Sequence, residues 1–279
     1  MKSYLLGLYE KAMPNVLTFR EKLHCAKSHG YDYMELSIDE TEEKLARLDM
    51  SRAERRALVD AMWDEELPVG SICLSGHRKY PLGSADPSVR ARSLDIMEKA
   101  VALAADLGVR TIQIAGYDVY YDQSTEETRA YFLKGLRTCA DMAARGGVVL
   151  AFETMETPFM DNVGKAMTYV KSVSSPYLHV YPDVGNCTNA AKRYGADVLA
   201  DLELGRGHLA ALHLKETVPG VYREVEFGAG HVDFKAIVSA ALSMGVCRFV
   251  TELWDVPSIP YEEHIRCSKA FIDGVFASL

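Results

Sequence analysis

The chain has 279 residues, of which 48% are hydrophobic, and its 39 acidic residues outnumber its 31 basic residues to give a formal net charge of −8. This charge argues against nucleic acid or an anionic membrane as a partner, although a few local cations can still bind a small anion. Six scattered cysteines without a Cys-x-x-Cys pair, and the lack of an apolar run long enough for a signal peptide or a membrane span, predict a cytoplasmic protein with reduced thiols.

Short apolar strands alternate with amphipathic helices along the chain. In the recurring unit, a helical stretch and a glycine precede a strand that is apolar at nearly every position, as in a parallel sheet buried on both faces. Four glycines are predicted to end helices in the left-handed conformation: Gly30, Gly108, Gly146 and Gly245. Strands are predicted near residues 4–8, 33–37, 69–75, 111–115, 148–153, 178–183, 209–214 and 248–253. Helices are predicted near residues 17–28, 52–65, 87–106, 125–144, 163–172, 195–204, 233–244 and 260–276.

Residues that are typical of helix N-termini mark several of these boundaries. Ser51, the Asp86-Pro87 pair, Ser124 and Asp233 stand where a helix would begin. Eight strand–helix alternations without a change of composition predict an α/β fold, a single-domain (β/α)8 TIM barrel over residues 1–279. An open doubly wound sheet is the alternative, and it is disfavoured because no Gly-x-Gly-x-x-Gly follows the first strand.

The last four predicted strands each end in a side chain that can bind a metal. The strand ends VVLAFE, LHVYPD, LAALH and RFVTE place Glu153, Asp183, His213 and Glu252 at the rim where TIM barrels hold their active sites. A single strand-end carboxylate is more often a helix cap or a salt-bridge partner, and a lone histidine is more often a core residue. Three converging carboxylates, however, repel one another unless a cation lies among them. Three oxygens and one nitrogen predict one divalent metal, Zn²⁺ or Mn²⁺ first, with Co²⁺ or Mg²⁺ as alternatives.

Several motifs resemble one family of sugar-phosphate epimerases. The motifs are AFETMETPFMD, YPDVGN, HLKET, FGAGHVDF and TELW, with LGLYEKAMP, YDYMELSIDETEEKLARLDMSR, CLSGHRKYPLGS and TIQIAGYDVYY in the N-terminal half. Together they resemble the L-xylulose-5-phosphate (L-ribulose-5-phosphate) 3-epimerase family of the xylose-isomerase-like barrel superfamily, which acts in bacterial L-ascorbate and pentulose catabolism. The resemblance spans nearly the whole chain.

The resemblance implies an isomerase in which Glu153, Asp183, His213 and Glu252 are the metal ligands. It also implies that Glu153 and Glu252 act as the acid and base, so that one removes a proton from C3 of the ketose and the other returns a proton to the opposite face. The metal would stabilise the intervening cis-enediolate as a Lewis acid. Which glutamate is the base for which epimer stays open at this point.

A phosphorylated sugar substrate needs local cations and polar contacts. The residues predicted to bind the substrate or its phosphate are Ser75, His77 and Arg78 of the loop SGHRKYPLGS, together with Lys11, Asn186, Lys215, Arg223, Glu156 and Glu35. Epimerases of free ketoses commonly carry histidine where Asn186 stands, so the asparagine favours a phosphorylated substrate and can donate a hydrogen bond to a hydroxyl. Glu35 could instead position a loop, Glu156 could support Glu153, and the cations could be solvated loop charges.

Three other functions fit the same barrel less well. A metal-dependent phosphoesterase resembling DNA-repair endonucleases would need more histidines at strand ends and a basic face. A sugar isomerase or an inosose-type dehydratase would keep the metal ligands, and activity assays on a panel of sugars would separate it from an epimerase. A non-catalytic sugar-binding barrel would not need both Glu153 and Glu252. A homodimer is compatible with the sequence.

Overall fold

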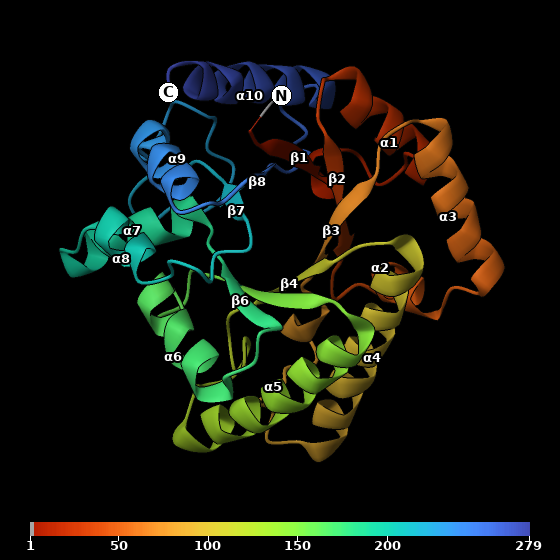
Figure 1. Ribbon diagram of the computed structural model, residues 1–279, viewed down its shortest axis with the longest axis vertical. Helices are drawn as coiled ribbons and strands as arrows, with labels where there is room; N and C mark the ends of the chain where they lie inside the picture. The colour runs from red at the N-terminus through yellow and green to blue at the C-terminus, as the bar shows by residue number, and fades with distance from the viewer. Residues whose placement is uncertain (1–2) are drawn as a thin grey trace.

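The computed structural model describes residues 3–279 as a ring of parallel strands surrounded by helices (Figure 1). The strands are β1 Leu5–Tyr9, β2 Tyr33–Ile38, β3 Val69–Leu74, β4 Thr111–Ala115, β5 Val149–Glu153, β6 Leu178–Tyr181, β7 Leu212–Leu214 and β8 Arg248–Thr251. Within the described residues these eight strands form one sheet in the order β6-β5-β4-β3-β2-β1-β8-β7. Parallel bridges from Val180 to Leu209 and from Asp183 to His213 join the two ends of that order. The predicted TIM barrel is therefore confirmed, and the open sheet is wrong.

The helices lie outside the barrel and follow the strands in turn. The longer helices are α1 Phe19–Ser28, α3 Arg52–Asp64, α4 Pro87–Leu107, α5 Glu126–Gly146, α6 Val163–Val173, α7 Val184–Tyr194, α9 Phe234–Ser243 and α10 Tyr261–Ala277. Shorter segments are α2 Glu42–Ala46, α8 Val198–Glu203 and the 3₁₀ turns η1 Glu10–Ala12, η2 Arg47–Asp49 and η3 Gly76–Arg78. Among residues 3–279, no helix combines the length and the apolar character that crossing a membrane would require.

Helix α7 was not predicted, because its first residues Val184-Gly185-Asn186 have the composition of a turn. The helix begins directly after β6, where the Asp183 side chain accepts the backbone N–H of Asn186 at 2.9 Å and serves as the N-cap. It ends at Gly195, which adopts a φ of 62°. The predicted helix near 195–204 is the short α8, which is capped by Asp197.

Two predicted helix boundaries are wrong by one residue. Thr125 caps α5, because its side chain accepts the N–H of Thr128 at 3.2 Å, while the Ser124 hydroxyl donates to Asp118 instead. The left-handed residue after α5 is Gly147, with a φ of 63°, whereas Gly146 is the last helical residue. A Cβ at Gly146 would lie 2.4 Å from Cγ1 of Val101, so glycine there allows α5 to pack against α4.

The other predicted starts and glycines are confirmed. Ser51 forms a capping box at α3, Asp86 caps α4 with Pro87 in the first turn, and Asp233 caps α9. Gly30, Gly108 and Gly245 all have positive φ. The structure pairs none of the six cysteines in a disulfide within residues 3–279, and four of them are buried.

The interior of the barrel has a polar floor beneath the C-terminal ends of the strands. The ring of Tyr33 crosses the barrel between Gly7 and Gly70, where a Cβ on either glycine would lie 2.3 Å from the ring. Above it lie four buried side chains that can form hydrogen bonds: Glu35, Ser71, Gln113 and Tyr181. TIM barrels usually fill this space with branched apolar residues. The polar floor therefore indicates that the interior of this barrel supports a polar site at the rim.

Candidate metal centre and pocket

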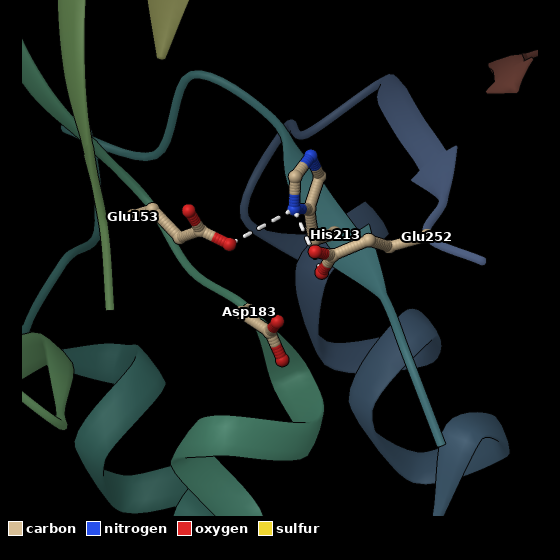
Figure 2. Close-up of side chains that lie close together, drawn as sticks. All are labelled: Glu153, Asp183, His213 and Glu252. Atoms are coloured by element: carbon tan, nitrogen blue, oxygen red, sulfur yellow. Dashed lines mark hydrogen bonds and ion pairs between the residues drawn. The ribbon is translucent and has the colours of Figure 1, made fainter. Parts of the chain in front are cut away.

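The structure brings the four predicted ligands together at the C-terminal rim of the barrel (Figure 2). Glu153 is the last residue of β5, Asp183 follows β6, His213 lies in β7 and Glu252 follows β8. One side-chain ligand atom from each lies within 4.8 Å of the others. The Nδ1 atom of His213 is 3.2 Å from Oε1 of Glu153 and 3.1 Å from Oε2 of Glu252.

Burial and mutual repulsion change the ionisation of these groups. Burial and the nearby Glu252 raise the pKa of Glu153. Burial also raises the pKa of Asp183 well above its ordinary value, although the Lys215 ammonium opposes this effect. For His213, the carboxylates of Glu35 and Glu252 outweigh burial and raise the pKa. The cluster therefore retains protons that a bound cation would displace.

Glu252 behaves differently from the other two carboxylates. Burial acts to raise its pKa, but the nearby cations Lys215 and His213 more than offset burial and hold the pKa of Glu252 well below its usual range. Lys215 is itself buried, forms an ion pair with Asp183, and has its Nζ atom 3.7 Å from Oε2 of Glu252. Lys215 is therefore a charge partner of the cluster as well as a wall of the pocket.

The four side chains fit a divalent metal. Their donor set is three carboxylates and one imidazole nitrogen, all buried, and their ligand atoms converge on one point of the rim. Buried carboxylates that lie this close together are unfavourable unless cations compensate them. The single lysine beside them leaves most of that charge uncompensated, so the arrangement is that of a cation site.

A pocket of about 530 Å³, including its open mouth, lies directly above these residues. Seven of the residues predicted to bind substrate line it: Lys11, Ser75, Arg78, Glu156, Asn186, Lys215 and Arg223. The pocket therefore brings together cations from the loops after β1, β3 and β7.

The rim cations differ in their partners. Lys11 forms an ion pair of 2.6 Å with Asp39. The Arg78 guanidinium lies 4.5 Å from the centre of the Tyr120 ring, and its Nε atom is buried without a hydrogen-bond partner. Arg223 is 3.7 Å from Glu156 and stacks near Trp254. Arg78 is thus the rim cation whose hydrogen-bonding capacity is least used within the protein.

Asn186 lines the pocket, and a hydrogen bond within the protein orients its side-chain amide. Its Nδ2 group donates to the backbone oxygen of Thr154 at 2.8 Å, which fixes the orientation of the amide. Its Oδ1 atom is buried and has no hydrogen-bond partner. Its oxygen is therefore free to accept a hydrogen bond, and the second N–H of the amide keeps the predicted donor role open to test.

Two predicted substrate residues lie away from the pocket lining. His77 is turned inward, where its Nε2 atom is 3.1 Å from the backbone oxygen of Ser93, and burial lowers its pKa to about 4. A neutral buried histidine does not supply a cation to a phosphate. Glu35 lies fully buried beneath the cluster, with Oε1 2.6 Å from Nε2 of His213. Glu35 therefore contacts a predicted metal ligand from beneath the pocket, and its predicted contact with substrate stays a prediction.

Four further pocket residues were missed by the sequence reasoning: Tyr9, Cys73, Met155 and Tyr222. Tyr9 ends β1, and Cys73 stands one residue before the end of β3, so a search of strand ends that included uncharged residues would have found both. Tyr222 lies in the loop after β7, and nothing in the sequence distinguishes it from the other tyrosines. Trp254, which follows Glu252 by two residues, also lines the pocket.

A family model and individual known proteins both match most of this chain. The family described as xylose isomerase-like TIM barrel matches residues 23–272. The L-ribulose-5-phosphate 3-epimerase UlaE of Salmonella paratyphi C (strain RKS4594) is 45% identical over 254 residues, which cover 91% of this chain and 88% of that protein.

Solved structures share the fold at low sequence identity. A structure of L-ribulose 3-epimerase superposes with a TM-score of 0.80 at 17% identity and covers 99% of this chain and 95% of its own. D-allulose 3-epimerase from Methylomonas sp., in complex with D-allulose, gives a TM-score of 0.79 at 17% identity and covers 98% of both chains. At this identity the likeness concerns the fold alone.

Proposed function

The chain belongs to the L-ribulose-5-phosphate 3-epimerase family of xylose isomerase-like TIM barrels, and we propose that it interconverts L-ribulose 5-phosphate and L-xylulose 5-phosphate. These two sugars differ only in the configuration at C3. The observation that carries the proposal is the buried cluster of Glu153, Asp183, His213 and Glu252 beneath a cation-lined pocket, in a chain 45% identical to epimerases of this substrate.

Inversion at C3 requires a proton to leave one face of the sugar and another to arrive at the opposite face. Glu153 and Glu252 come from β5 and from the end of β8, so their carboxylates approach the cluster from different sides (Figure 2). One of the two carboxylates would remove the C3 proton, and the other would return a proton to the opposite face, with the roles exchanged in the reverse reaction.

Asp183, His213, Glu153 and Glu252 would hold the metal. When bound, a divalent cation supplies Lewis acidity that stabilises negative charge on O2 and O3 of the ketose while C3 is deprotonated. Zn²⁺ or Mn²⁺ suits this donor set best, and Co²⁺ or Mg²⁺ can use the same oxygens and nitrogen.

The phosphate would lie at the rim, where Lys11, Ser75, Arg78 and Arg223 line the pocket. Arg78 is the residue best placed to bind it, because guanidinium groups match the geometry of phosphate oxygens and that of Arg78 has no carboxylate in an ion pair. The buried Oδ1 atom of Asn186 would accept a hydrogen bond from a sugar hydroxyl.

The test is proton NMR of L-ribulose 5-phosphate incubated in D₂O with the metal-loaded enzyme. We expect the C3 proton signal to disappear and the signals of L-xylulose 5-phosphate to grow. A panel containing free L-ribulose, an aldopentose phosphate and an inosose separates the related reactions. If the C3 proton neither exchanges nor inverts, while another member of the panel reacts, the assignment of the substrate is wrong.

A further inference from the structure

A buried hydrogen-bond network supports His213 from below. The Oε1 atom of Glu35 lies 2.6 Å from Nε2 of His213. The other oxygen of Glu35, Oε2, accepts the Ser71 hydroxyl at 2.6 Å and the Tyr181 hydroxyl at 3.1 Å. Glu35, Tyr181 and His213 have no exposed surface, and Ser71 is buried too. The carboxylate is therefore held on both oxygens and cannot turn away from His213.

The network determines which nitrogen of His213 faces the predicted metal ligands. A glutamate that accepts two hydroxyl donors on one oxygen acts as an acceptor toward Nε2 with the other, so Nε2 carries the hydrogen. In the neutral ring the lone pair is then on Nδ1, and Nδ1 is the atom that faces Glu153 and Glu252. The ligand nitrogen of His213 is therefore Nδ1.

Glu35 also adds a fourth carboxylate to the buried charge of the site. Glu35, Glu153, Asp183 and Glu252 are all buried, and the cation beside them apart from His213 is Lys215. One lysine leaves three of these formal negative charges uncompensated, and a dication would reduce that to a single charge. The extra carboxylate thus increases the attraction of the site for a divalent cation.

We propose that Glu35 is a positioning residue for the metal, because it fixes the His213 tautomer that presents Nδ1 and thereby increases metal affinity. A carboxylate behind a ligating histidine fixes the ring and raises its basicity. The inference rests on the metal centre of the proposed function and is independent of which sugar the enzyme acts on. Its test therefore uses no sugar, so its failure is distinct from a failure of the substrate assignment.

The first experiment is a Zn²⁺ titration of the metal-free protein, in competition with a chromogenic chelator, for wild type and Glu35→Gln. Loss of such a supporting carboxylate typically weakens metal binding by about 10- to 100-fold, and we expect a change of that size. Glu42→Gln is the matched control, because it removes an exposed carboxylate that pairs with Lys79 and does not line the pocket, and it should keep the wild-type Kd. Folded Glu35→Gln protein with a wild-type Kd would overturn the proposal.

The second experiment needs no variant of Glu35 and tests the proposal even if Glu35→Gln does not fold. Nitrogen-15 NMR of histidine-labelled, Zn²⁺-loaded wild type reports which ring nitrogen carries a hydrogen. We expect His213, assigned by comparison with His213→Gln, to show a protonated Nε2 in a strong hydrogen bond and an unprotonated Nδ1 bound to zinc. A protonated Nδ1 with zinc on Nε2 would show that Glu35 does not have this role.

Discussion

The two halves of the barrel rim contribute to the pocket in different ways. Strands β5 to β8 each deliver a ligand-type side chain within one or two residues of the strand end, and the four converge. Strands β1 to β4 are followed by loops, and of the loop residues predicted to bind phosphate, Lys11, Ser75 and Arg78 line the pocket while His77 turns into the core. Side chains at strand ends are positioned by the register of the sheet, whereas loop side chains are positioned by tertiary contacts.

Metal removal should have the largest effect, because the four predicted ligands all come from the β5–β8 half. Dialysis against a chelator should reduce C3 proton exchange to the background rate and lower the melting temperature. A ligand at 100 times its Kd stabilises the folded state by about 2.7 kcal/mol, which corresponds to several degrees for a chain of this size. Calorimetry measures the melting temperature and the NMR assay measures the rate of C3 proton exchange, each before and after Zn²⁺ or Mn²⁺ is added back. Full activity of a protein shown to be metal-free would contradict the metal site.

Substitution of Glu153 or Glu252 by glutamine should lower the rate of C3 proton exchange nearly as much as metal removal does. General acid–base catalysis contributes about 10²- to 10⁴-fold, so Glu153→Gln and Glu252→Gln should each lower the rate of C3 exchange by at least that factor. Metal content must be measured alongside, since both residues are also ligands. A Glu153→Gln protein that holds metal and exchanges C3 at the wild-type rate would exclude Glu153 as acid or base.

The sequence predicted most of the fold and the metal half of the site for one physical reason. Strands buried on both faces are continuous apolar runs, so the polar residue that ends each run marks the rim, as at Glu153 and Glu252. Glu35 lies inside the second predicted strand, and its role depends on a contact with His213, which lies 178 residues away in the chain. No local pattern contains that information.

The loop half was harder to predict because loop residues of similar chemistry have different surroundings. Adjacent residues His77 and Arg78 both resemble phosphate ligands, but η3 turns the first toward Ser93 and the second toward the pocket. Asn186 was placed in the pocket correctly, but the orientation of its amide depends on the backbone oxygen of Thr154.

Arg78→Ala should have an intermediate effect on catalysis, and it tests whether the loops after β1 to β4 bind the phosphate. A hydrogen bond to a charged group contributes about 1.5–3 kcal/mol, so loss of the guanidinium should raise the KM for the phosphorylated ketose by about 10- to 100-fold. The kcat should change little, because the proposed role of Arg78 is to bind the phosphate and not to transfer the C3 proton. The KM for free L-ribulose, where measurable, is the control and should stay the same. A fall in kcat alone would indicate that Arg78 does more than hold the phosphate.

His77→Gln should have the smallest effect on catalysis and a distinct effect on stability. Burial lowers the pKa of His77 to about 4, below its ordinary value of 6.5, so the unfolded chain binds this proton more tightly than the folded one. Wild-type stability should therefore fall as pH drops from about 6.5 to about 4, by on the order of 3 kcal/mol from this group. Glutamine cannot gain a proton, so denaturant unfolding of the variant should lack this component of the pH dependence.

The comparison of His77→Gln with Arg78→Ala tests whether His77, in the loop after β3, is a neutral core residue or reaches the pocket when substrate binds. If His77 is a neutral core residue, its substitution changes the pH dependence of unfolding and leaves the KM for the phosphorylated ketose unchanged, whereas the adjacent Arg78 shows the reverse. If His77→Gln instead raised the KM as much as Arg78→Ala, with unfolding that depended on pH as in wild type, His77 would have to reach the pocket when substrate binds. The loop would then have a different conformation in the complex, and the contact between His77 and Ser93 would have to break.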